Sequence, residues 1–151
     1  MNNSHTTLIR SSSVLAAALL VGASLTGCSA IDAFKNSAAD AWQVTYEVSV
    51  DSSEPTTLTA VSYLDQATRA DTRAPVVNDS VTASPREGGI ATWSVESIVI
   101  VGDTTSVTAT PAEGLTATCR ILLDGTREIA SETSAAGAPV QCEAVAPPFD
   151  Q

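Results

Sequence analysis

The chain has 151 residues, with seven Lys or Arg and seventeen Asp or Glu, and carries a formal net charge of −10. Because affinity for nucleic acid comes largely from cations that displace counterions, this acidic balance excludes nucleic-acid binding. The one histidine, His5, lies in a stretch with the pattern of a cleaved leader, residues 1–27. The mature chain then has no imidazole for general-base catalysis or for metal binding. We therefore expect no enzyme, no cofactor and no metal site.

Residues 1–27 have the pattern of a bacterial lipoprotein signal peptide. A polar start with one cation, Arg10, precedes roughly a dozen apolar residues, too few to cross a bilayer. The segment ends in Leu-Thr-Gly27-Cys28, which resembles the lipobox of bacterial lipoproteins. This resemblance implies cleavage after Gly27 and lipidation of Cys28, which would hold the protein on the extracytoplasmic face of the cell membrane. The alternative is an ordinary secretory signal in which Cys28 falls near the cut by chance.

The mature chain divides into a tether, a domain and a tail. Residues 28–41 form the tether, which is either a short helix with a weak apolar stripe or a flexible spacer. Residues 42–147 form the domain, and residues 148–151 the tail. From Trp42 to Val50 every second residue is apolar, which predicts a strand with one buried face.

Further short segments rich in Val and Thr recur about every ten residues. They predict strands over 57–64, 76–83, 90–101, 105–110, 115–123, 126–132 and 140–144. Ser84-Pro85 is expected to end the 76–83 strand, and Asp65–Pro75 is expected to be a loop or a helical turn. Asp124-Gly125 predicts a two-residue hairpin turn, because both positions favour positive φ. Seven or eight such strands indicate an all-β sandwich.

Two cysteines remain once Cys28 is assigned to the lipid. Cys119 is in phase with the apolar residues of its strand and should face inward, and Cys142 lies in the last strand. Exported proteins meet an oxidising compartment, which favours a Cys119–Cys142 disulfide over two free buried thiols.

Several motifs of the domain resemble those of the MmpS family, small mycobacterial membrane proteins that accompany RND-type (MmpL) exporters of lipids and siderophores. The similarity runs from the Trp42-Gln-Val-Thr-Tyr-Glu-Val strand, through Trp93-Ser, to the Cys119-Arg-Ile-Leu-Leu-Asp-Gly hairpin and Cys142. It implies an immunoglobulin-like β-sandwich outside the membrane, with a Cys119–Cys142 disulfide. The family has an uncleaved transmembrane helix where this chain has the lipobox.

Function is expected to be binding rather than catalysis. The first hypothesis is an anchored accessory module for an RND-type exporter or its cargo, with Trp42 and Trp93 as contact surface, although each tryptophan is more often a packed one. The alternative is a structural cell-envelope lipoprotein. An enzyme with paired carboxylates is less favoured, since the acids form no recognisable motif. A cation site is less favoured too, because Asp65, Asp71 and Asp79 do not follow a calcium-loop pattern.

Overall fold

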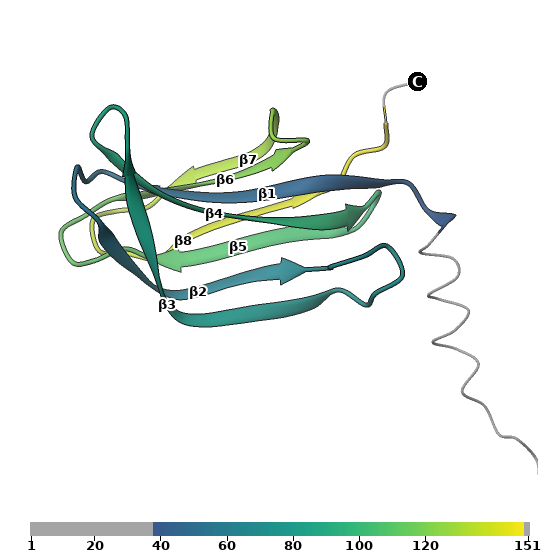
Figure 1. Ribbon diagram of the computed structural model, residues 1–151, viewed down its shortest axis with the longest axis horizontal. Coiled ribbons are helices and arrows are strands. Elements are labelled where there is room, and N and C mark those ends of the chain that lie inside the picture. The colour runs from purple at the N-terminus through teal and green to yellow at the C-terminus, as the bar shows by residue number, and fades with distance from the viewer. Residues whose placement is uncertain (1–37, 150–151) are drawn as a thin grey trace, which may run out of the picture.

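A computed structural model of the chain describes residues 38–149, which form eight antiparallel β-strands (Figure 1). The strands are β1 (Ala41–Val50), β2 (Thr56–Asp65), β3 (Ala74–Arg86), β4 (Ile90–Ile100), β5 (Thr104–Thr110), β6 (Ala117–Leu123), β7 (Arg127–Thr133) and β8 (Val140–Val145). The all-β prediction and each predicted strand are confirmed. The predicted leader, with Gly27 and Cys28, and most of the predicted tether lie outside the described residues.

The strands form one sheet that nearly closes on itself, in the order β7-β6-β1-β4-β3-β2-β5-β8. Strand β3 connects its two halves, because it pairs with β2 over Ala74–Ala83 and with β4 over Ser84–Arg86. The prediction that Ser84-Pro85 ends this strand is therefore wrong. Pro85 lies opposite Ala91 in the short ladder to β4, near the end of the strand, where a missing N–H donor is tolerated.

The core follows from the period-two pattern of β1. Its alternate residues are fully buried and stand in register with alternate residues of β6, which are fully buried too. The pairs are Val44 with Leu123, Tyr46 with Ile121, Val48 with Cys119, and Val50 with Ala117. Each large apolar side chain buried in this way contributes about 1.5–3 kcal/mol of transfer free energy. The alternation in the sequence thus sets which face of the central strands points inward.

A disulfide joins Cys119 on β6 to Cys142 on β8, with an S–S distance of 2.06 Å and a Cα–Cα distance of 5.9 Å. Both residues are fully buried, so the inward orientation predicted for Cys119 is confirmed, as is the disulfide. No ladder pairs β6 with β8. The covalent bond therefore holds together two strands that hydrogen bonds do not.

Backbone conformation explains two local features. Asp124 and Gly125 have φ values of 48° and 69° between β6 and β7, so the turn and its positive φ values are as predicted. The predicted length of two residues is wrong: Leu123 pairs with Arg127, so Thr126 is part of the connection, and its N–H donates to the carbonyl of Leu123. Ala60 also has a positive φ, 48°, at a bulge where β2 shifts its register against β5. Nothing in the sequence pattern predicted this bulge. The segment between β2 and β3 is a loop of turns and bends, one of the two alternatives expected for it.

Candidate functional site

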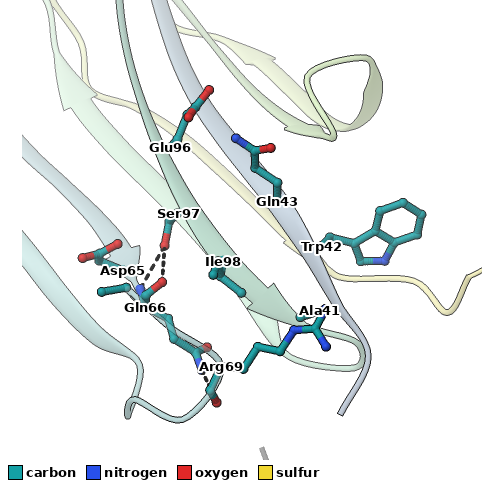
Figure 2. Close-up of a pocket in the computed structure, with 10 residues that line it drawn as sticks. Ala41, Trp42, Gln43, Asp65, Gln66, Arg69, Glu96, Ser97 and Ile98 are labelled. Atoms are coloured by element: carbon teal, nitrogen blue, oxygen red, sulfur yellow. Dashed lines mark hydrogen bonds between the residues drawn. The ribbon is translucent and has the colours of Figure 1, made fainter. Parts of the chain in front are cut away.

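One end of the fold gathers the start of β1, the end of β4, the β2–β3 loop and the segment after β8 (Figure 1). The chain enters the domain at this end, at Ala41. A groove of about 540 Å³ lies here, where β3 has parted from β4 and the two halves of the sheet diverge. Its lining residues come from β1, β4 and the β2–β3 region (Figure 2): Ala41, Trp42, Gln43, Asp65, Gln66, Ala67, Arg69, Glu96, Ser97 and Ile98.

Gln66 fixes the loop wall of the groove. Its backbone N–H donates to Ser97 Oγ at 2.9 Å (Figure 2). Its carbonyl accepts from the N–H of Ile98 at 3.2 Å. Its side-chain Nε2 donates to the carbonyls of Arg69 at 3.2 Å and Asp71 at 3.0 Å. The residue is only 2% exposed. These bonds tie the loop to β4 although no ladder joins them, so the groove wall is preformed.

Arg73, the last residue before β3, closes the core at the same end. Its guanidinium donates through Nη2 to the carbonyl of Ile98 at 3.1 Å and through Nη1 to the carbonyl of Thr104. It therefore links the end of β4 to the start of β5. Its Nε and the Oε1 of Gln66 are the buried side-chain polar atoms without a partner among residues 38–149. Both atoms are shielded from solvent, which makes them part of the wall rather than of the groove surface.

Tyr46 provides the polar contact beneath this loop. Its hydroxyl donates to the carbonyl of Leu64 at 2.7 Å. Burial raises the pKa of the phenol to about 12; the nearby cation of Arg73 lowers it and the carboxylate of Asp65 raises it. Burial also raises the pKa of Tyr63, whose ring contacts that of Tyr46 at a centroid distance of 5.7 Å. Tyr46 stays protonated at neutral pH and holds the end of β2 in place.

Trp42 attaches the segment after β8 to the start of β1. Its indole Nε1 donates to the carbonyl of Pro147 at 2.8 Å, and its ring contacts that of Phe149 at 4.2 Å between centroids. The guanidinium carbon of Arg127 lies 5.7 Å from the indole centroid, a cation–π geometry. The tryptophan is half-buried and lies beside the groove, next to Gln43.

The structure does not bring Trp93 to the same site. Trp93 pairs in register with Val48, six residues along β1 from Trp42, which corresponds to about 20 Å of extended strand. It is half-buried, and its ring packs against Tyr63 at 5.9 Å between centroids. The two tryptophans named from the sequence therefore belong to different parts of the molecule.

The groove is lined by one serine hydroxyl, that of Ser97, and by two carboxylates, those of Asp65 and Glu96. The Ser97 hydroxyl is engaged with Gln66 in both directions, since it accepts from the N–H and donates to the carbonyl at 3.4 Å. Asp65 is half-buried and Glu96 is exposed, so the two carboxylates do not form a buried pair. Gln66 and Arg73 were not predicted, because a glutamine and an arginine in a polar loop carry no sequence signal of burial.

The three aspartates considered for cation binding have separate surroundings. Asp65 lies in the groove wall and Asp79 within β3. Asp71 Oδ2 accepts from the N–H and the hydroxyl of Thr68, at 2.9 and 2.7 Å, which stabilises the β2–β3 loop. Over residues 38–149 there is no group of three or more His, Cys, Asp or Glu residues placed to hold a metal ion.

No family model matches the chain, and no curated protein matches it significantly. Within the described range, no helix is both long enough and apolar enough to span a membrane.

Proposed function

We propose that the protein is a non-catalytic binding module that is anchored by lipid to the extracytoplasmic face of the cell membrane. The observation that carries this proposal is the position of the groove at the end where the chain enters the domain. Ala41 lies thirteen positions after Cys28, and a fully extended chain of that length spans at most about 45 Å. A lipid on Cys28 would therefore keep the groove close to the membrane surface.

The finer fold assignment is part of the same proposal. Strands β7-β6-β1-β4 and β3-β2-β5-β8 would form the two layers of an immunoglobulin-like sandwich, joined by β3 and by the Cys119–Cys142 disulfide. Support comes from the strand order and from the motifs that resemble the MmpS family, in which such a domain accompanies a membrane exporter.

On this basis we propose that the partner is an RND-type, MmpL-like exporter of lipids or siderophores. The groove supports this role because it is preformed and combines apolar groups, such as Ile98, with amide and charged groups, such as Gln43 and Arg69. A surface of this mixed kind suits a protein partner or an amphipathic cargo. The second candidate is a structural envelope lipoprotein, which the fixed packing of Trp42 and Trp93 favours, since neither ring stands free.

Site-specific photo-crosslinking in the native membrane separates these two candidates. A photoreactive residue at Gln43, which is exposed and lines the groove, should capture the exporter. The matched control is the same residue at Glu54, which is exposed in the β1–β2 connection at the other end of the fold. Capture from Gln43 alone supports the accessory role. Absence of an exporter from both positions, in an anchored protein with its disulfide intact, would leave the structural role.

A further inference from the structure

The nearly closed sheet is open along one line, the seam between β7 and β8. Strands β7 and β8 are the two ends of the strand order, and no ladder joins them. The disulfide links β8 to β6, the neighbour of β7, and not to β7 itself. A groove of about 630 Å³ runs along this seam, lined by Ile129–Ser134 on one side and by Pro139, Val140, Gln141 and Glu143 on the other.

Strand β7 presents its free edge to the groove. Five consecutive residues of β7, Ile129–Thr133, line it, whereas a strand that showed only one face would contribute every second residue. After a register irregularity between Ile121 and Leu122 of β6, the ladder is regular from Ala130 to Thr133. No proline interrupts this part of β7. Every second residue of an edge strand turns its N–H and C=O away from its one partner, which leaves them free to pair with an added strand.

The seam is acidic. Glu132 is in register with Cys119, whose side chain lies in the core, and residues opposite each other in a ladder project to the same face. Glu132 therefore lies on the inner face of the sheet at its open edge. Glu143 of β8 lines the groove as well, and its lining residues include no Lys or Arg.

The acidic charge of the groove favours one kind of binding partner over another. An inward-pointing carboxylate opposes pairing with another acidic edge, and a net charge of −10 opposes association of two copies of this chain. A strand that brought a Lys or Arg toward Glu132 would instead remove the repulsion. The geometry and the charge thus favour a basic segment over a second copy.

We infer that the β7–β8 groove binds an extended, basic peptide segment by strand addition to the edge of β7, with a Lys or Arg side chain directed toward Glu132. This site lies between the two ends of the strand order, whereas the β3–β4 junction is in its middle. The inference does not depend on the exporter role proposed above.

The test uses the full chain in detergent, with its disulfide intact, and a capped seven-residue peptide of alternating valine and threonine with one central lysine. Two further peptides are N-methylated at the odd or at the even positions, so that each lacks one set of N–H donors but keeps the charge. Binding is followed by NMR through the amide exchange rates of residues 129–133. The parent peptide should slow the exchange of alternate amides in β7, and one N-methylated peptide should bind while the other does not.

Two charge variants complete the design. Glu132→Gln should weaken binding about fivefold, the effect of losing one favourable ion pair worth about 1 kcal/mol. Glu87→Gln removes the same charge from an exposed residue of the β3–β4 turn and should leave binding unchanged. The inference is overturned if both N-methylated peptides bind equally, if the two variants weaken binding equally, or if no peptide binds. If the amide exchange of residues 129–133 slows as the protein concentration rises without any peptide, the edge of β7 pairs with a second copy of the chain, and the inference is overturned as well.

Discussion

Replacing both bonded cysteines with alanine, Cys119→Ala/Cys142→Ala, should lower the free energy of unfolding by about 3.4 kcal/mol through chain entropy alone. The disulfide closes a loop with a sequence separation of 23 residues, which contains β7 and its connections. The loop-entropy relation, −2.1 − 1.5R ln n cal/mol/K, gives about −11 cal/mol/K for this separation, or about 3.4 kcal/mol at 25 °C. For a domain of this size the loss corresponds to a melting temperature lower by roughly 15 °C.

Urea titration and thermal melting, followed by circular dichroism, measure the effect. The oxidised wild type is compared with the double variant, and the reduced wild type serves as the control that keeps both sulfur atoms. The reduced wild type and the double variant should have similar unfolding free energies and melting temperatures, and both values should be well below those of the oxidised protein. Any difference in unfolding free energy between the reduced wild type and the double variant reports the packing of the buried sulfur atoms.

A loss below about 1 kcal/mol would refute this reasoning, because the β6–β8 link would then restrict the unfolded chain far less than its loop length requires. Two titratable thiols in denatured, unreduced protein would refute it more directly, since the bond itself would be absent.

Three further predictions follow from the contacts. Burial raises the pKa of Tyr46 to about 12 from an unfolded value of 10.0, so the native state binds the proton more tightly, and this residue should lower stability by up to about 2.7 kcal/mol between pH 10 and 12. In urea titrations Tyr46→Phe should remove this contribution and leave the smaller one of Tyr63, whose pKa is raised as well. Arg73→Met should cost about 2 kcal/mol in the same assay, because two backbone carbonyls lose their charged donor; an unchanged midpoint would contradict the bridging role. Gly125→Ala should cost about 1 kcal/mol, since alanine is strained at a φ of 69°, and a neutral result would argue against the turn geometry.

Most of the fold was predictable because its signals are local. The alternation from Trp42 to Val50 defines a buried face without reference to any other segment, and Asp124-Gly125 encodes its turn through backbone preference alone. The extension of β3 through Pro85 was not predictable in this way. It depends on a change of partner from β2 to β4, which is a property of the sheet rather than of the segment.

The candidate site was much less predictable. Trp42 was named for its residue type, and the structure places it beside the groove, but its contacts with Pro147 and Phe149 come from the far end of the chain. Gln66 is buried because the loop folds against Ser97 and Ile98 of β4, about thirty residues away in the sequence. Such long-range contacts produce no periodic pattern in the sequence of the polar loop, so the burial of Gln66 could not be predicted from the sequence.

The anchor is the central claim, because the proposed orientation of the groove and the proposed partner both depend on it. Intact mass measurement of the protein extracted from its native membrane tests it most directly. We predict a chain that begins at Cys28 and carries the added mass of a diacylglycerol group, with or without a further acyl chain. A chain that retains residues 1–27, or one that begins at or near Cys28 without any lipid mass, would contradict the account.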